Sequence, residues 1–330
     1  MIELSTPNNL SVTVPENLNE DESLRFNPYN NIDEAIKYYQ SNGYVIFSNC
    51  VSKDICNQLK VLWDKEIKPF KGKIYRQATA KAEKHVLNAN NWIMNPIVNL
   101  QSLNPNLFGN LRSLADSQIF SDSTICKILN SILGSKPKIV QSMYFEGNSA
   151  TWEHQDTYYL DSEEIGLMTA GWLALEEIKA DAGRFFICPQ SHKIDLGKQN
   201  SNNNIVDNHN AYIQEVVSII KSKKMPIKAP YLNVGDILFW NSRTIHGSLD
   251  SQSKNFSRSS ITIHAIPHNH KLLQFHSRKI DLKTDDLTNS LIHRPKDQSK
   301  LINKLIFFIE SSFPNIFYWL KNRIIKLVIR

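Results

Sequence analysis

The N-terminal third of the chain alternates helical patterns with one short apolar run. Residues 32–39 place apolar side chains at helical spacing, and Gly43 predicts the end of that helix. The run YVIFSNC at residues 44–50 predicts a strand. Ser52 is a suitable cap for a second helix, whose apolar positions fall within residues 55–63. A helix–strand–helix unit therefore opens the predicted core.

The pattern changes to short β-rich runs from about residue 136 onward. These runs cover residues 136–147, 167–178, 183–189, 227–232, 236–248 and 257–267. Turn signals rich in Gly, Asn and Asp separate them. Several short strands at this spacing are typical of an antiparallel sandwich or jelly roll, so we expect a mainly β fold with flanking helices.

Three further stretches carry local predictions. Residues 122–134 predict a helix that stops at Gly134, and residues 86–100 predict a helix at their end. The Asn-rich insert at residues 198–213 predicts a mobile loop that helps to select the substrate.

The two ends of the chain differ from the middle. The polar residues 1–30 predict a flexible, loosely held arm, and residues 31–297 form the predicted jelly-roll domain with its helical N-terminal part. Residues 298–330 return to helical periodicity, interrupted at Pro314, and interleave apolar with basic residues. This basic amphipathic tail has two interpretations. Either residues 314–330 make peripheral contact with a membrane, or the tail packs on the core or on a second subunit.

The composition is that of an ordinary soluble domain, with 41% hydrophobic and 21% charged residues. The net charge of +6 suits an anionic small-molecule substrate or a membrane surface; no nucleic-acid-binding motif accompanies it, so we expect no nucleic-acid partner. Four scattered cysteines without a C-x-x-C pair favour a reducing, cytoplasmic setting. We expect neither a signal peptide nor a membrane-spanning helix, because the required apolar runs are absent from the sequence.

The stretch TWEHQDTYYL, residues 151–160, places His154 and Asp156 two positions apart. Side chains at i and i+2 of a strand share one face, so this imidazole and carboxylate can bind one metal ion. An ordinary surface polar pair is the alternative. His246, at the end of another predicted strand, supplies a third ligand. Two histidines and one carboxylate form the facial triad of non-haem Fe(II) oxygenases, which leaves positions open for O2 and a co-substrate.

Arg258 and Ser248 extend this set of residues toward a co-substrate. 2-Oxoglutarate is the usual reductant at such iron sites, and its distal carboxylate needs a fixed cation that binds it in a bidentate way. Arg258 begins the strand-like run that follows His246, and Ser248 lies two residues past His246 on the same face. We therefore predict that both side chains bind the distal carboxylate.

The order of these motifs resembles the phytanoyl-CoA dioxygenase family of Fe(II)/2-oxoglutarate oxygenases. The resemblance covers residues 31–267 and is carried by H-x-D, LALEEIKADAGRFFICPQSHK, VGDILFWNSRTIHGS and SRSSITIHAI, in that order. The opening AIKYYQSNGYVIFSNCVSKDICNQL is also similar to the first unit of the family. The resemblance implies a double-stranded β-helix, that is, a cupin-like jelly roll. It implies three Fe(II) ligands, which are His154, Asp156 and His246.

The resemblance also implies residues that contact 2-oxoglutarate. Arg258 and Ser248 match the carboxylate-binding positions, and Trp172 matches a position that lines the co-substrate pocket. Gln155 matches a position that faces co-substrate or substrate. The chain departs from the family at Glu153, where a Trp often precedes the first ligand, and this leaves the pocket wall and the substrate open.

The carboxylate ligand separates two kinds of iron chemistry. In related iron halogenases a small residue takes its place so that chloride can bind, so Asp156 favours hydroxylation of a small molecule of the acyl, amino-acid or natural-product type. Two other classes remain as alternatives. One is a non-catalytic jelly-roll binding protein, and the other is a zinc hydrolase with the same three ligands. The zinc hydrolase does not explain Arg258 and Ser248. No motif indicates the oligomeric state.

Several other residues have two interpretations. His264 suits a hydrogen-bonded core position better than a pocket position. The basic stretch at residues 71–84 is either a solvated face or a contact for an anionic group of the substrate. Tyr144, Tyr158 and Tyr159 flank the predicted metal-binding strand, where they line a pocket or pack in the core.

Overall fold

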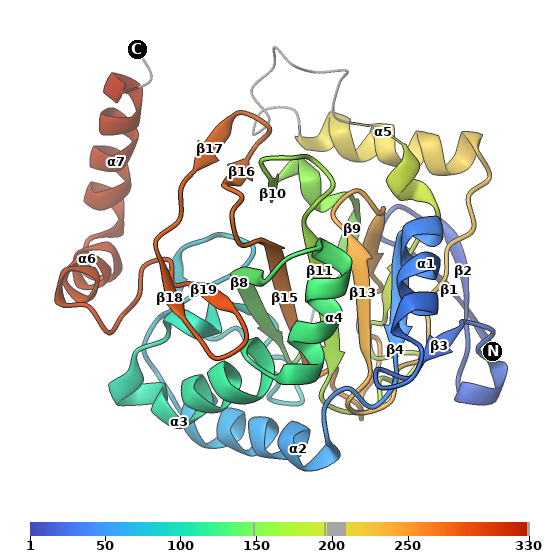
Figure 1. Cartoon of the computed structure of the whole chain (residues 1–330). Coiled ribbons are helices and arrows are strands. Elements are labelled where there is room, and N and C mark those ends of the chain that lie inside the picture. The colour runs from blue at the N-terminus through green and yellow to red at the C-terminus, as the bar shows by residue number, and fades with distance from the viewer. Residues whose placement is uncertain (148, 195, 197–208, 329–330) are drawn as a thin grey trace.

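A computed structural model describes residues 1–147, 149–194, 196 and 209–328. Its main layer is a nine-stranded sheet in the order β18-β19-β8-β15-β11-β13-β4-β3, with β7 also paired to β8 (Figure 1). These strands are β3 (Arg25–Phe26), β4 (Tyr44–Phe47), β7 (Ile97–Val98), β8 (Pro137–Phe145), β11 (Thr169–Ala174), β13 (Ile237–Asn241), β15 (Ser260–Pro267), β18 (Thr284–Asp286) and β19 (Leu291–His293). Neighbouring strands are antiparallel except for the pairs β3–β4 and β8–β19.

A smaller sheet, in the order β12-β14-β9, faces the large one. Its strands are β9 (Thr151–His154), β12 (Phe185–Ile187) and β14 (His246–Ser248). Trp172 on β11 and Trp240 on β13 lie against the ring of Phe185 on β12, with centroid distances of 5.7 and 4.7 Å. Apolar burial between the two layers forms one of the cores of the molecule. The two facing sheets, which are antiparallel apart from the edge pairs β3–β4 and β8–β19, confirm the predicted jelly-roll sandwich.

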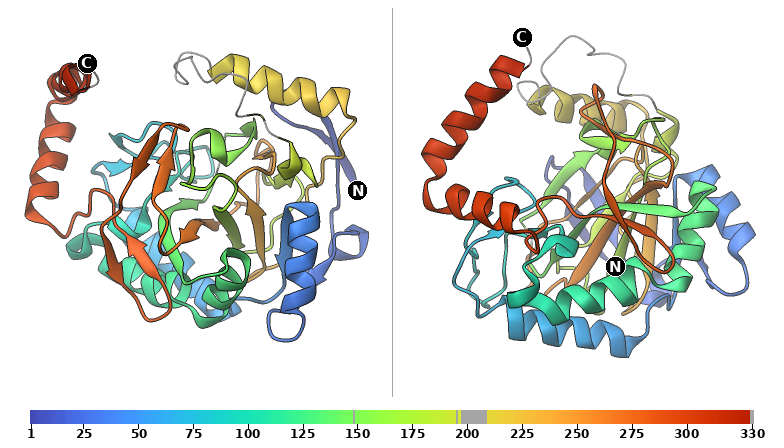
Figure 2. Two further views of the ribbon diagram at one scale, coloured as in Figure 1. Left: turned by 45° about the horizontal axis from the view of Figure 1, so that its top comes forward. Right: turned by 60° about the vertical axis from the view of Figure 1, so that its left-hand side comes forward.

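Four helices cover the other face of the large sheet (Figure 2). They are α1 (Ile32–Asn42), α2 (Lys53–Leu62), α3 (Pro105–Ala115) and α4 (Ser123–Leu133), and the π-helical turns η2 (Trp63–Ile67) and η4 (Asp116–Phe120) extend α2 and α3. The ends of α1, α2 and α4 follow the sequence signals. The Ser52 side chain accepts a hydrogen bond from the Ile55 amide, and Gly43 and Gly134 end their helices in the left-handed conformation.

The N-terminal residues form a hairpin that packs on the small-sheet side. Strands β1 (Ile2–Ser5) and β2 (Ser11–Val14) pair in an antiparallel way, and η1 (Leu18–Glu20) follows them. Val12 and Val14 are buried in a cluster with Phe186 of β12. This differs from the loosely held arm predicted for residues 1–30. The alternating apolar side chains of β2 are buried even though the surrounding composition is polar.

Smaller elements complete the fold. A three-stranded sheet contains β10 (Leu160–Ser162), β16 (Leu272–Gln274) and β17 (Arg278–Ile280), and β5 (Ile74–Tyr75) pairs with β6 (Ala82–Glu83). Helix α5 (His209–Ser222) crosses one end of the sandwich (Figure 1). The short helices η3 (Leu100–Ser102), η5 (Asp156–Tyr158) and η6 (Ser191–Lys193) occupy connections.

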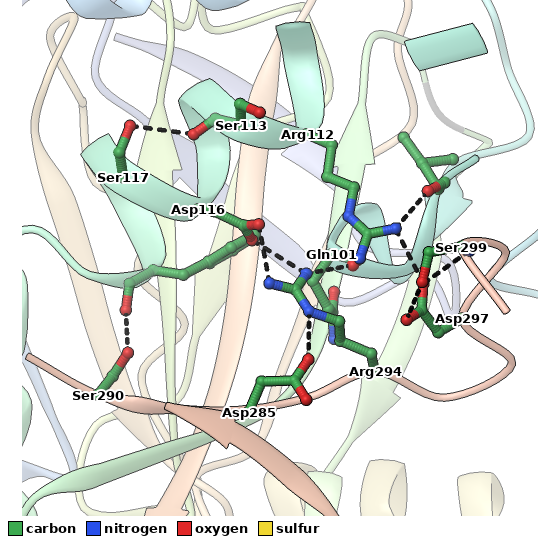
Figure 3. Close-up of polar contacts among 12 residues, drawn as sticks. Gln101, Arg112, Ser113, Asp116, Ser117, Asp285, Ser290, Arg294, Asp297 and Ser299 are labelled. Carbon is green, nitrogen blue, oxygen red and sulfur yellow. Dashed lines mark hydrogen bonds and ion pairs between the residues drawn. The ribbon is translucent and has the colours of Figure 1, made fainter. Parts of the chain in front are cut away.

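A charged network fixes the segment after β18 to the helical layer (Figure 3). Arg294 donates hydrogen bonds to Asp116 at the end of α3, to Asp285 on β18 and to the Gln101 carbonyl. Arg112 on α3 pairs with Asp297 at 2.9 Å. The chain therefore leaves the sandwich from a firmly held point.

The last two helices lead away from that point. Helix α6 (Leu301–Ser312) and helix α7 (Pro314–Val328) stand at the edge of the molecule in Figures 1 and 2. Pro314 is the first residue of α7, so the predicted interruption is present. Among the described residues no helix is long and apolar enough to cross a membrane.

Three local predictions were wrong or only partly right. Residues 86–100 contain β7 rather than a final helix, because Ile97 and Val98 pair with Tyr144 and Met143 near the end of β8. The run at residues 227–232 forms no strand, since only Lys228 makes an isolated bridge. The predicted loop at residues 198–213 includes the start of α5 from His209 onward, and its earlier part lies outside the described residues.

Candidate metal centre

The two histidines of the predicted triad face each other across a strand pair. His154 ends β9 and His246 begins β14, and the antiparallel register places them directly opposite one another. Their ring centroids are 4.3 Å apart. Asp156 follows two residues after His154, in the turn η5, with Gln155 between them in an extended conformation. The three predicted ligands are therefore brought together by one strand pair and the turn that follows it.

The ligand atoms converge on one point. The Nε2 atoms of His154 and His246 lie 3.6 and 3.5 Å from Oδ1 of Asp156, and one ligand atom from each residue lies within 4.8 Å of the others. All three residues are buried. A single metal ion bound to the three atoms would fit this arrangement.

Hydrogen bonds select the ring nitrogen that can bind metal. Nδ1 of His154 lies 2.8 Å from the Trp152 carbonyl, and Nδ1 of His246 lies 2.9 Å from the Thr244 carbonyl. A carbonyl can only accept, so each Nδ1 carries the proton and each Nε2 keeps its lone pair. Burial lowers the pKa of His246 to about 4, so this ring is neutral at neutral pH.

The carboxylate is also oriented by a neighbour. Trp240 donates its indole N–H to Oδ2 of Asp156 at 2.8 Å, which leaves Oδ1 directed at the two histidines. Burial on its own would raise the pKa of Asp156, but the imidazoles of His246, His154 and His264 oppose it, and the pKa lies well below its usual value. Asp156 is thus an anion, the form that a metal requires.

His264 is a site residue that the sequence analysis placed in the core instead. It lies in the middle of β15, with Nε2 3.6 Å from Oδ2 of Asp156. Its Nδ1 is buried and makes no hydrogen bond among the described residues. The alternation of side chains along β15 could have indicated this position. Arg258, Thr262 and His264 lie at even spacing and so share one face, whereas Ile263 is buried on the opposite face, against the helices.

Arg258 is an uncompensated cation inside the sandwich. It is 2% exposed, and Nη1 donates to the Gly183 carbonyl at 2.8 Å while Nε makes no hydrogen bond in the described part of the chain. Its guanidinium lies over the rings of Phe145 and Trp172. No acidic side chain of the described residues pairs with it, and burial lowers its pKa to about 9. An anion that enters here would be strongly favoured.

A row of aromatic rings connects the metal ligands to Arg258. The ring of Phe185 stacks on His246 at 5.3 Å and on Trp172 at 5.7 Å, and the Arg258 guanidinium lies 5.4 Å from the Trp172 ring. Trp172 therefore lies between Phe185 and Arg258, and its contact with a co-substrate stays a prediction.

Ser248 reaches the same region from the small sheet. Ser248 pairs in register with Phe185 on β12. Phe185 comes two residues after Gly183, and the Gly183 carbonyl accepts a hydrogen bond from Arg258. Gly183 has φ +83, and a Cβ there would approach the Leu249 carbonyl to 3.0 Å, so only glycine suits this turn. The Ser248 hydroxyl accepts a hydrogen bond from the Thr151 amide at 3.0 Å.

Gln155 is directed elsewhere. Its side-chain amide donates to the carbonyls of Ile194 and Arg243, and its backbone amide donates to the Tyr212 hydroxyl. The structure therefore gives Gln155 a bracing position between η6, α5 and the chain before β14. Contact of its side chain with a co-substrate stays a prediction.

Two tyrosines and a histidine stand beside the metal ligands. The ring of Tyr159 is 5.7 Å from that of His154, and its hydroxyl lies 2.7 Å from Nε2 of His209 at the start of α5. Tyr158 stacks on Tyr212 of α5 at 3.7 Å. Tyr144, in contrast, stacks on Trp63 in the helical layer, so it belongs to the core.

Glu153 connects the metal site to the N-terminal hairpin. This carboxylate is fully buried directly before His154, and it accepts hydrogen bonds from the Thr6 hydroxyl and the Asn8 amide. The departure from the family pattern at this position therefore has a structural reason, because the hairpin supplies the donors that a buried carboxylate needs.

The fold and the ligand set are those of the non-haem iron oxygenase class. A model of the family named phytanoyl-CoA dioxygenase (PhyH) matches residues 39–260. The chain belongs to this family. The match includes all three proposed metal ligands and Arg258.

Curated relatives carry the same family name. The phytanoyl-CoA dioxygenase domain-containing protein 1 homologs of Caenorhabditis briggsae and Caenorhabditis elegans are 25% and 24% identical to the chain over 153 residues. Each alignment covers 44% of this chain and 52% of the relative. The chain thus matches about half the length of these relatives.

Solved structures share the fold at low identity. SnoK, a non-haem alpha-ketoglutarate-dependent carbocyclase from nogalamycin biosynthesis, has a TM-score of 0.53 and 16% identity, covering 76% of this chain and 89% of SnoK. The epimerase SnoN in complex with Fe3+, alpha ketoglutarate and nogalamycin RO has a TM-score of 0.52 and 15% identity, covering 81% and 96%. EctD from S. alaskensis with bound Fe has a TM-score of 0.50 and 15% identity, covering 77% and 83%.

Proposed function

We propose that the protein is an Fe(II)/2-oxoglutarate-dependent dioxygenase that hydroxylates an unactivated C–H bond of a small molecule. The observation that carries the proposal is that the interior of the sandwich holds two polar sites, the cluster of metal ligands and Arg258. One site holds three converging ligand atoms with fixed lone pairs, and the other holds Arg258, a buried cation that has no acidic partner among the described residues. A dicarboxylate co-substrate that also binds the metal would complete both.

His154, Asp156 and His246 would hold Fe(II) on one face and leave the opposite face open. When bound, Fe(II) and 2-oxoglutarate supply the activation of O2, in which 2-oxoglutarate becomes succinate and CO2, one oxygen atom enters succinate and the other becomes the hydroxyl of the product. The protein supplies position, charge and a water-poor site.

Arg258, Ser248 and Trp172 would bind the distal part of 2-oxoglutarate. The planar guanidinium forms two parallel hydrogen bonds with a carboxylate, which is why Arg suits this position. Its stacking between Phe145 and Trp172 fixes the plane of the fork before the ligand arrives. Ser248 adds a hydroxyl from the small sheet. Without the distal carboxylate of 2-oxoglutarate, Arg258 would be a buried cation with no anion beside it among the described residues. Binding of 2-oxoglutarate is therefore favoured.

The substrate would enter beside Tyr159 and His209. These side chains stand next to His154 and present a phenol and an imidazole, which suit a polar or anionic organic molecule. The acyl, amino-acid and natural-product classes all remain candidates, and the presence of Asp156 as a carboxylate ligand supports hydroxylation. Structural neighbours include a carbocyclase and an epimerase, so products of this chain should be analysed for ring closure and epimerisation as well as for hydroxylation.

We further propose that residues 31–297 form the catalytic domain and that the protein works in the cytoplasm. The described cysteines, Cys50, Cys56, Cys126 and Cys188, are all buried free thiols, as expected in a reducing compartment. Ferrous iron is also retained most readily under reducing conditions.

The test is an anaerobic titration of the metal-free protein with Fe(II) and then with 2-oxoglutarate. We expect the weak visible charge-transfer band of the iron chelate in the unmodified protein and no band in His154→Ala. Iron binding without the band would favour a metal site of another kind, such as the zinc hydrolase. Absence of iron binding would favour the non-catalytic binding protein. A positive result allows substrates to be screened by succinate release.

A further inference from the structure

We propose that α6 and α7 bind the surface of an anionic lipid membrane, with both helices lying in the interface. The two helices expose many large apolar side chains to solvent. Leu301 is 83% exposed, Phe308 61% and Trp319 54%. Among the side chains that the structure describes here, the exposed large apolar ones are Leu301, Ile302, Leu305, Ile306, Phe308, Ile309, Phe313, Ile316, Trp319 and Leu320. Leu301, Leu305 and Phe308 follow one another at helical spacing on α6, as do Ile302, Ile306 and Ile309, so the exposed side chains of this helix are neighbours. A gathering of exposed apolar side chains marks an interaction site rather than ordinary exposed residues.

The inner side of α6 is fixed, so the helix cannot turn this apolar surface toward the core. Glu310 is buried and accepts hydrogen bonds from the hydroxyls of Tyr75 and Tyr318. Lys73 donates to the Ser311 carbonyl, and the ring of Phe307 packs on Tyr75. These contacts attach α6 to β5 and leave its other side outward.

Charge favours a lipid partner over a second copy of the chain. From residue 300 to the end, the sequence holds six basic residues, which are Lys300, Lys304, Lys321, Arg323, Lys326 and Arg330. The single acid in this segment, Glu310, is buried and bonded to the protein. The described apolar surface is therefore flanked by cations and by no exposed acid of α6 or α7. Two such surfaces repel each other, whereas anionic headgroups attract them.

The basic stretch of the sequence analysis lies next to this surface. Lys81 is positioned over the ring of Tyr318 on α7, and Lys73 binds α6, whereas Lys71 and Lys84 are exposed. Part of the stretch thus holds the helices in place, and part extends the positive rim. The apolar surface also begins earlier than the predicted contact at residues 314–330, because α6 contributes six of the ten exposed apolar side chains named above.

The arrangement suits an interfacial helix and not a spanning one. Neither helix is long and apolar enough to cross a bilayer, within the described residues. Apolar side chains, a flanking Trp and Lys or Arg at the margin are the features by which amphipathic helices lie at the level of the headgroups. This inference is independent of the iron chemistry.

The test is vesicle flotation of the whole protein with two lipid compositions, phosphatidylcholine alone and phosphatidylcholine with phosphatidylserine. We expect flotation with the anionic vesicles and loss of most of it at high salt. Replacing Lys321 and Arg323 with Glu should weaken binding by about fivefold or more for each cation removed. Phe308→Glu with Trp319→Glu should abolish binding.

A matched control is Leu107→Glu, which places the same charge at an exposed apolar position on α3. It should leave flotation unchanged. Far-ultraviolet circular dichroism of each variant shows that the helices are still folded. Flotation that is equal in the Phe308→Glu, Trp319→Glu protein would overturn the proposal. A second result would also overturn it: the unmodified protein does not bind anionic vesicles and instead forms a concentration-dependent dimer, and these substitutions make that dimer dissociate.

Discussion

Trp240 donates its indole N–H to Oδ2 of Asp156, and this one hydrogen bond links the large sheet to the metal ligands of the small sheet. The other carboxylate oxygen is thereby left for metal. Outer partners of metal ligands fix their orientation and contribute to affinity.

We expect Trp240→Phe to weaken Fe(II) binding by about 10- to 100-fold, because Asp156 loses the donor that orients it. Trp63→Phe is the matched control. Trp63 is equally buried, and its indole nitrogen makes no hydrogen bond in the described structure. Anaerobic Fe(II) titration followed by calorimetry measures both. Equal losses in the two variants would show that Trp240 acts through packing alone.

Arg258→Lys should raise the concentration of 2-oxoglutarate needed for half-saturation by about 10- to 100-fold. Lys keeps the charge but cannot form the two parallel hydrogen bonds, and a bond to a charged group contributes about 1.5–3 kcal/mol. Iron affinity should be unchanged, since Arg258 touches none of the ligands.

Arg184→Lys controls for the loss of a buried guanidinium. Arg184 lies on the opposite side of β12 from Phe185 and donates to the carbonyls of Ile178 and Pro15. We expect this variant to be less stable but to bind 2-oxoglutarate normally. A normal response of Arg258→Lys to 2-oxoglutarate would remove Arg258 from the co-substrate site.

Thr6→Val with Asn8→Leu should destabilise the protein by about 2–4 kcal/mol, because Glu153 is left as a buried carboxylate without donors. Urea denaturation measures the loss. The same two substitutions in a Glu153→Gln background should cost clearly less, since a neutral amide is less harmful when unpaired. An equal cost in both backgrounds would mean that the hairpin contributes only apolar packing.

Arg294→Ala should lower the free energy of unfolding by about 2–3 kcal/mol, because it removes the hydrogen bonds to two aspartates and a carbonyl that join β18 to the helical layer. Arg278→Ala, at an exposed position of β17, should change it by less than about 0.5 kcal/mol. Thermal denaturation of the pair distinguishes a network that stabilises the fold from a set of surface contacts.

The sequence predicted the parts of the fold that local chemistry determines. Gly43, Gly134 and Ser52 end or begin helices where expected, because capping depends only on nearby residues. The metal ligands were predictable because the spacing of His154 and Asp156 and the later His246 carry a recognisable ligand chemistry.

The missed features depend on distant partners. His264 looked like a core residue because the sequence does not say which face of β15 meets Asp156. The N-terminal hairpin looked loose because the residues that hold it, Glu153 and Phe186, lie far along the chain. The pairing of Ile97 with Tyr144 near the end of β8 is likewise a long-range contact, and it overrides a local preference for helix.

The division of the site between two layers gives its ligands a mechanical role. His154, Asp156 and His246 all belong to the small sheet and its following turn, whereas Arg258 precedes β15 of the large sheet. A 2-oxoglutarate molecule joined to the metal at one end and to Arg258 at the other would act as a reversible cross-link between the layers. Each turnover would then break and re-form that cross-link. The two layers would therefore be held together most strongly when 2-oxoglutarate is bound, before the reaction begins.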